Sequence, residues 1–158
     1  MLFRSVAGLS RKKKSQFLHV QKLSEHVDAL RRIADEFTAE IDRDASSYDA
    51  VMAAFKLPQG NPDEIRAREQ AIETATKGAS EVPLEVAGKA ATLVERLVQL
   101  EAISSASMKS DVLVARLMAV AGAKGALANV EINLEGLKDA AYVAQMRGKV
   151  DELRKRLG

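Results

Sequence analysis

Asp44 is a carboxylate on the apolar face of a long helical pattern. Apolar residues recur mostly three and four positions apart from Leu23 to Phe55, and Asp44 fills the position between Ile41 and Tyr48. A carboxylate there breaks the apolar pattern and is costly to bury unless it is paired. In a cleft, such a group often serves as an acid or base with a displaced pKa. An ion pair, or a cap at a break in the helix, is the structural alternative, and both interpretations stay open.

Two asparagines lie one helical turn apart at the end of the most apolar helical segment, 108–134. Asn129 and Asn133 interrupt a run of small and apolar residues that is typical of a central helix in a bundle. Asparagine is a poor helix former, and an unpaired buried amide costs about 1–3 kcal/mol. We therefore expect both amides to have partners, either on a neighbouring helix or on a ligand.

Three further polar residues have simple structural explanations. Lys56 ends the long helix, where the helix dipole favours a cation, and Asp111 begins the central helix, where N-capping explains it. Lys13 belongs to the basic run 11–14, which is a solvated connection or a holder for an anionic tail. Asp111 and Asn129 lie about 27 Å apart along their helix, so they share a site only if another chain contributes.

Composition restricts the class of protein. The chain has 158 residues, which fits a single domain over 1–158, and it has no cysteine and two histidines, so no metal site is expected. A net charge of +2 argues against nucleic acid as a partner. No apolar run reaches the roughly 18–20 residues that span a membrane. The apolar start precedes the basic run, the reverse of a signal peptide, which favours a cytoplasmic protein.

The elements that must position these residues are all helical. Alanine, leucine, glutamate and lysine are frequent, aromatic residues are few, and no alternating strand pattern persists. Pro83 is expected to start a new helix or to kink the preceding one. The expected helices cover about 16–57, 62–80, 80–102, 108–134 and 138–157. The sequence therefore predicts an all-α fold built as an elongated bundle.

Three segments together carry a family resemblance. They are "IDRDASSYDAVMAAFKLP" at 41–58, "RAREQAIETATKGASEVPLEVA" at 66–87 and "KSDVLVARLMAVAGAKGALANVEINLEGLKD" at 109–139. In this order they resemble the formiminotransferase-cyclodeaminase / methenyltetrahydrofolate cyclohydrolase family, and the likeness covers nearly the whole chain. The resemblance implies an all-α, up-and-down bundle with long antiparallel helices. It also implies a homodimer with a folate site where helices or subunits meet.

The resemblance implies acid–base chemistry at one carbon of a reduced folate. Either the formimino group is converted to the methenyl bridge with release of ammonia, or water hydrolyses the methenyl bridge. No permanently bound cofactor is expected, because the tetrahydrofolate derivative is the substrate. Asp44 would take and return the proton. The expected substrate-binding residues are Lys13, Lys56, Asp111, Asn129 and Asn133.

These substrate-binding residues are expected to meet different parts of the folate. The two asparagine amides would hydrogen-bond the pterin or the amide of the folate, or order the helix end beside it. Lys13 and Lys56 would meet the glutamate carboxylates. The family pattern starts with a longer, glycine-rich helix, of which only residues 2–9 correspond here. A second hypothesis is therefore a truncated or diverged, non-catalytic bundle that serves as a binding or structural protein.

Overall fold

The computed structural model describes residues 20–158, with side chains from residue 23 onward. The segment 2–9 and Lys13 lie outside the described residues. The helices are α2 (Val20–Phe55), α3 (Pro62–Ile103), the short 3-10 helix η2 (Ala106–Met108), α4 (Lys109–Glu135) and α5 (Ala140–Leu157). No strand occurs between residues 20 and 158. The predicted all-α fold is confirmed.

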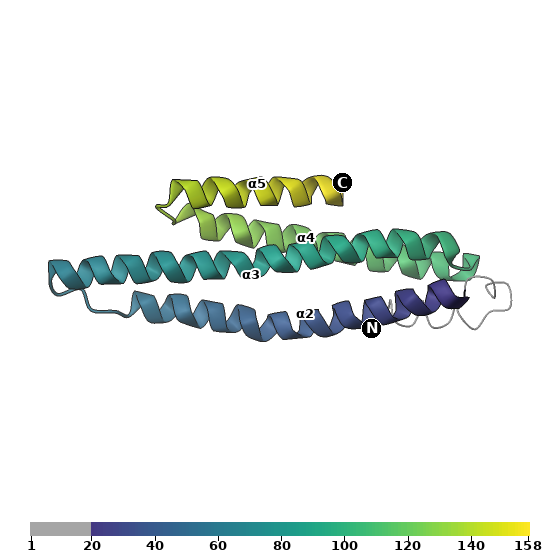
Figure 1. Ribbon diagram of the computed structural model, residues 1–158, viewed down its shortest axis with the longest axis horizontal. Coiled ribbons are helices and arrows are strands. Elements are labelled where there is room, and N and C mark those ends of the chain that lie inside the picture. The colour runs from purple at the N-terminus through teal and green to yellow at the C-terminus, as the bar shows by residue number, and fades with distance from the viewer. Residues whose placement is uncertain (1–19) are drawn as a thin grey trace.

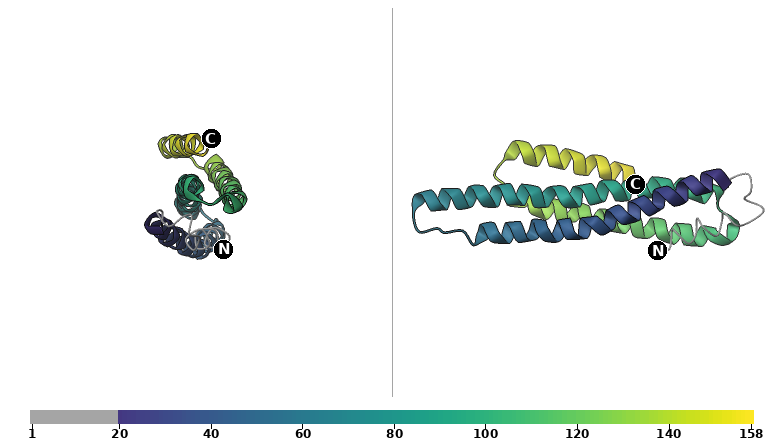
Figure 2. Two further views of the ribbon diagram at one scale, coloured as in Figure 1. Left: turned by 90° about the vertical axis from the view of Figure 1, so that its right-hand side faces the viewer. Right: turned by 60° about the horizontal axis from the view of Figure 1, so that its bottom comes forward.

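The long helices run up and down beside one another, with α3 as the common neighbour (Figure 1). Helix α3 contacts α2, α4 and α5, and successive long helices are antiparallel. Viewed along the bundle, α3 lies between α2 and α5, and α4 lies to one side (Figure 2). The end of the α2–α3 hairpin extends beyond α4 and α5 (Figure 1). Helix α2 therefore has α3 as its main partner.

The turn between α2 and α3 follows the predicted local chemistry. The Asn61 side chain accepts hydrogen bonds from the backbone N–H groups of Asp63 and Glu64, at 3.1 and 2.9 Å. Pro62 occupies the first turn, where its missing N–H is harmless. The Glu64 carboxylate accepts from the backbone N–H of Gly60 at 2.7 Å. This reciprocal cap fixes where α3 begins.

Helix α3 continues through Pro83, so of the two expected outcomes, a new helix or a kink in the preceding one, no new helix begins there. Proline has no N–H to donate to the carbonyl four residues earlier, which here belongs to Ala79. The Asn133 amide nitrogen on α4 donates to that carbonyl at 2.9 Å. A side chain from a neighbouring helix therefore replaces the missing backbone bond and allows α3 to remain one helix.

The apolar core lies between the first half of α2, the second half of α3, α4 and α5. Its fully buried large side chains include Leu30, Leu97, Leu127 and Met146. The second half of α2 differs, because Ile41 and Tyr48 are 68% and 62% exposed. The prediction that this half has a buried apolar face is therefore wrong. One neighbouring helix covers only a narrow stripe of α2, and α4 does not cover the rest.

Candidate functional site

A groove between α2, α3 and α4, which we call the central groove, collects three of the predicted site residues. Two adjoining cavities of about 270 and 340 Å³ form it, and Asp44, Pro83 and Asn129 line both. Asn133 and Tyr48 line the smaller cavity. The remaining lining residues are Ser47, Val51, Ala79, Phe37, Glu40, Ile41, Val86 and Ala126. Residues far apart in the sequence thus meet at one site.

Asp44 lines the groove without being buried, which corrects the sequence prediction. The residue is exposed, because the half of α2 that carries it packs on α3 alone. Its carboxylate forms no ion pair or hydrogen bond with any described side chain or backbone group. Its backbone carbonyl accepts from the Ser47 hydroxyl at 2.8 Å. The carboxylate is therefore available to a ligand or a proton.

The two asparagines have different surroundings. Asn133 is partly buried and donates its amide N–H to the Ala79 carbonyl on α3, which is one of the two kinds of partner expected. Asn129 is exposed and lines both cavities, and its amide has no hydrogen-bond partner among the described residues. Asn129 can therefore offer a donor and an acceptor to a ligand in the groove.

Glu40 is a site residue that the sequence analysis missed. It is 5% exposed, lines the groove one helical turn before Asp44, and accepts from Lys89 at 2.5 Å and Arg43 at 2.8 Å. Two cations therefore compensate this buried carboxylate, as burial requires. Its spacing of three from Phe37 and seven from Ile33 is the signal that could have found it.

Arg43 links this cluster to the surface of α3. Its guanidinium also donates to Glu85 at 2.6 Å. That hydrogen bond lowers the pKa of Glu85 below its usual value and, together with the nearby carboxylates, raises the pKa of Arg43. The cluster is thus a set of paired charges at one end of the groove, while the carboxylate of Asp44 remains unpaired.

Lys56 and Asp111 do not join the groove within one chain. Lys56 is exposed in the turn after α2, and Asp111 lies in the first turn of α4, near the opposite end of that helix from Asn129. Neither lines the central groove. Lys13 falls outside the described residues. The structure therefore assembles Asp44, Asn129 and Asn133 in one groove and places Lys56 and Asp111 outside it.

The groove combines a proton acceptor, hydrogen-bonding amides and apolar surface. Ile41, Phe37 and Tyr48 provide apolar and aromatic contacts beside Asp44. Such a set suits a flat polar heterocycle with a reacting carbon near the carboxylate. Between residues 20 and 158, no cluster of three or more acidic or histidine side chains could hold a metal ion. None of the described helices is both long and apolar enough to span a membrane.

Fold and groove together define an up-and-down helical bundle with an unpaired carboxylate and an unpaired amide in a groove between three helices. The model of the formiminotransferase-cyclodeaminase family matches residues 1–152. The chain therefore belongs to this family. It is similar to the formimidoyltransferase-cyclodeaminase of Sus scrofa, with 34% identity over 137 residues, covering 82% of this chain and 25% of the relative.

Two further comparisons agree with this assignment. The methenyltetrahydrofolate cyclohydrolase of Methylorubrum extorquens is 31% identical over 134 residues, covering 85% of this chain and 63% of the relative. The solved structure of formiminotetrahydrofolate cyclodeaminase from Thermotoga maritima matches with a TM-score of 0.79 at 22% identity, covering 99% of this chain and 74% of that one. The match to this solved structure shows the fold of the chain. The chain spans about a quarter of the length of the formimidoyltransferase-cyclodeaminase relatives.

Proposed function

We propose that this chain acts on a one-carbon derivative of tetrahydrofolate bound in the central groove. The reaction is either closure of a formimino group to the methenyl bridge with release of ammonia, or hydrolysis of the methenyl bridge. The observation that carries the proposal is the unpaired Asp44 carboxylate beside the unpaired Asn129 amide, in a groove shared by three helices. The similarity to relatives named for these two activities supports it.

Both reactions need one group that accepts a proton and then returns it. In the first reaction, N10 of the folate attacks the formimino carbon and loses its proton to Asp44. Asp44 then returns this proton to the formimino nitrogen, which leaves as ammonia. In the second, water adds to the methenyl carbon as Asp44 accepts its proton, and the ring opens when the folate nitrogen is protonated. A carboxylate within hydrogen-bond reach can serve in either case. The reaction as proposed requires no permanently bound cofactor.

The other groove residues position the substrate. Asn129 donates and accepts hydrogen bonds with the pterin or amide part of the folate. Asn133 keeps α4 in register with α3 through its bond to the Ala79 carbonyl, and so holds Asn129 opposite Asp44. Ile41 and Phe37 contact the apolar faces of the substrate rings. Covering these side chains excludes water and strengthens the electrostatic interactions within the site.

A homodimer completes the proposal. Five large apolar residues of α4 are exposed. These are Leu113, Val114, Leu117, Met118 and Ile132, which are 40%, 47%, 59%, 67% and 65% exposed. Exposed apolar residues gathered on one helix are typical of a protein–protein interface. We propose that a second copy covers them; light scattering that finds a monodisperse monomer would contradict this.

The first experiment measures turnover and binding with the wild-type chain. The methenyl absorbance of methenyltetrahydrofolate should decay faster with the protein than without it, or ammonia should be released from formiminotetrahydrofolate, and the active substrate identifies the reaction. Titration with 5-formyltetrahydrofolate, a stable analogue, should raise the melting temperature. Binding without turnover of either substrate would favour the non-catalytic alternative, and neither binding nor turnover would reject the proposed site chemistry.

A matched pair of variants locates the binding site. Asn129→Leu removes the free amide from the groove and should weaken stabilisation by 5-formyltetrahydrofolate. Gln99→Leu makes the same kind of change on exposed α3 surface outside the groove and should bind as the wild type does. Equal binding by both variants would place the folate elsewhere.

A further inference from the structure

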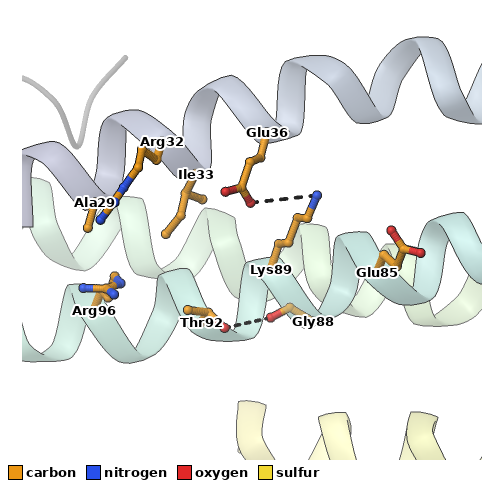
Figure 3. Close-up of a pocket in the computed structure, with 9 residues that line it drawn as sticks. All are labelled: Ala29, Arg32, Ile33, Glu36, Glu85, Gly88, Lys89, Thr92 and Arg96. Atoms are coloured by element: carbon orange, nitrogen blue, oxygen red, sulfur yellow. Dashed lines mark hydrogen bonds and ion pairs between the residues drawn. The ribbon is translucent and has the colours of Figure 1, made fainter.

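A second groove, which we call the cationic groove, lies between α2 and α3 without any contribution from α4 (Figure 3). It is a cavity of about 540 Å³. Its lining residues are Ala29, Arg32, Ile33, Glu36, Glu85, Gly88, Lys89, Thr92 and Arg96. It shares no lining residue with the central groove. A ligand in the cationic groove would therefore occupy a site that the proposed folate chemistry does not use.

The acidic residues of this groove are already paired. Glu36 lies 3.8 Å from the Lys89 ammonium, which also donates to the buried Glu40 carboxylate at 2.5 Å. Glu85 accepts from Arg43 at 2.6 Å. These ion pairs lie toward one end of the groove, so no carboxylate there is left to neutralise further cations.

Two arginines at the other end have no partner within the described chain. Arg32 on α2 and Arg96 on α3 form no ion pair or hydrogen bond with any described residue. Figure 3 shows them on opposite walls at the same end of the groove. Of the eight other arginines from residue 23 onward, Arg116 and Arg147 are also unpaired but line neither groove. The remaining six bind a carboxylate or carbonyl of this chain, namely Arg31, Arg43, Arg66, Arg68, Arg154 and Arg156. Two unpaired guanidinium groups that line one cavity repel each other, and an anion bound between them would be attracted to both.

Space for the carbon part of such a ligand lies along α3, about two helical turns before Arg96 (Figure 3). Gly88 lies in the interior of α3, where glycine is about 1 kcal/mol less favourable than alanine. A Cβ atom at Gly88 would meet nothing within 4 Å, so packing does not require glycine there. Ala29 and Ile33 add apolar surface beside the arginines. The site thus offers charge, space and a partly apolar wall.

We propose that the cationic groove binds a small organic anion through a carboxylate or phosphate group held between Arg32 and Arg96. Guanidinium groups match the planar, two-oxygen geometry of carboxylates and phosphates and bind them with paired N–H donors. The apolar wall at Ala29 and Ile33 accommodates the carbon part of the ligand. This inference goes beyond the proposed folate reaction and does not depend on it.

Titration with two probes at constant ionic strength tests the proposal. Sodium pyrophosphate represents phosphates and trisodium citrate represents carboxylates, with sodium chloride as the reference, and melting temperature and calorimetry report binding. At least one probe should bind saturably and stabilise the protein beyond the chloride reference. The responding probe identifies the anion class. If neither exceeds chloride, the groove is not an anion site.

Variants assign the binding to the two arginines. Arg32→Gln and Arg96→Gln should each weaken binding of the responding probe by roughly tenfold, the size expected for one charge-assisted hydrogen-bonding group. Arg96→Lys keeps the charge but loses the paired donors, so it should bind less tightly than the wild type. Gly88→Leu fills the space along α3 beside the arginine end while keeping both arginines, and it should also lose affinity.

Arg31→Gln is the matched control, because Arg31 is the neighbouring cation on α2, is exposed, and pairs with Asp28 outside the groove. It should bind the probe as the wild type does. If Arg31→Gln weakens binding as much as Arg32→Gln, the effect is general surface charge and the proposal is overturned. Circular dichroism and melting without probe confirm that each variant is folded, so lost affinity in a folded variant reports the site.

Discussion

The α4–α5 turn and the central groove each present an aspartate, and only one of the two is paired. Asp139 in the turn accepts from the Lys77 ammonium at 2.6 Å and from the backbone N–H of Tyr142 at 3.0 Å, which caps α5. These hydrogen bonds, that of Lys77 above all, lower the pKa of Asp139. Asp44 in the groove has no such partner among the described residues.

The polar neighbours of the two aspartates also differ in whether they are paired. In the turn, Glu73 accepts from the backbone N–H groups of Lys138 and Asp139, at 3.0 Å each, and the Tyr142 hydroxyl donates to the Lys77 carbonyl at 3.1 Å. In the groove, the exposed amide of Asn129 remains unpaired. Paired polar groups fix the position of a helix, whereas unpaired groups that line a cavity are available to a ligand. The turn therefore has the paired polar groups of a structural contact, and the groove has the unpaired groups that the proposed chemistry needs.

The largest expected effect separates the two aspartates by activity. Asp44→Asn removes the proposed proton acceptor and should lower the turnover rate by about 10²–10⁴-fold, the usual contribution of a general acid–base group. Its free energy of unfolding should change by less than about 0.5 kcal/mol, because the side chain has no partner to lose. Asp139→Asn should retain the turnover rate of the wild type. Steady-state kinetics and urea unfolding on the same preparations measure both properties.

Asp42→Asn serves as a second control, because Asp42 is exposed on the same helix and does not line the groove. It should be fully active. Full activity of Asp44→Asn would remove Asp44 from the mechanism, and loss of activity in Asp139→Asn with an intact fold would remove the distinction between the two regions.

The next effect concerns the one buried carboxylate that lines the groove. Glu40→Gln removes the anion shared by Lys89 and Arg43 and should lower the free energy of unfolding by about 1.5 kcal/mol, because both cations are partly exposed and keep Glu36 and Glu85 as partners. Urea unfolding measures this. In the background of Lys89→Met, the same substitution should cost much less, because one cation is already absent. Equal costs in both backgrounds would mean that the pair is not a coupled unit.

Local chemistry in the sequence predicted the helices and the start of α3, because a cap such as Asn61 depends only on its nearest neighbours. The meeting of Asp44 and Asn129 in one site was also predicted, through the family resemblance and the residues themselves.

The exposure of Asp44 was not predicted. The width of the buried stripe on α2 depends on how many helices cover it. The apolar periodicity of α2 alone does not show how many helices pack against it. The sequence left open whether Pro83 begins a new helix or kinks the preceding one, because the donor that replaces its missing N–H lies fifty residues later in the sequence.

A comparable effect tests that compensating donor. Asn133→Ala should lower the free energy of unfolding by about 1–3 kcal/mol, because the Ala79 carbonyl loses its partner. Pro83→Ala restores a backbone N–H four residues after Ala79, so Asn133→Ala should cost little in that background. A double-mutant cycle by urea unfolding measures this coupling. A cycle without coupling would show that Asn133 stabilises the bundle in another way.

The smallest expected effect is the pH dependence contributed by Asp139. The hydrogen bond from Lys77 lowers the pKa of Asp139 in the folded chain, so the unfolded chain binds its proton at higher pH. Its contribution to stability is therefore fully present above the unfolded value of about 3.9, and is lost as the pH falls through the lower folded value.

Asp139→Asn keeps an oxygen to cap α5 but removes the charge, so its melting temperature should fall less steeply below pH 4. Lys77→Met removes the cause of the shift and should flatten the same part of the curve. Because both substitutions remove one interaction, the double variant should be no flatter than either single variant; additive flattening would show that Lys77 and Asp139 act independently at the turn.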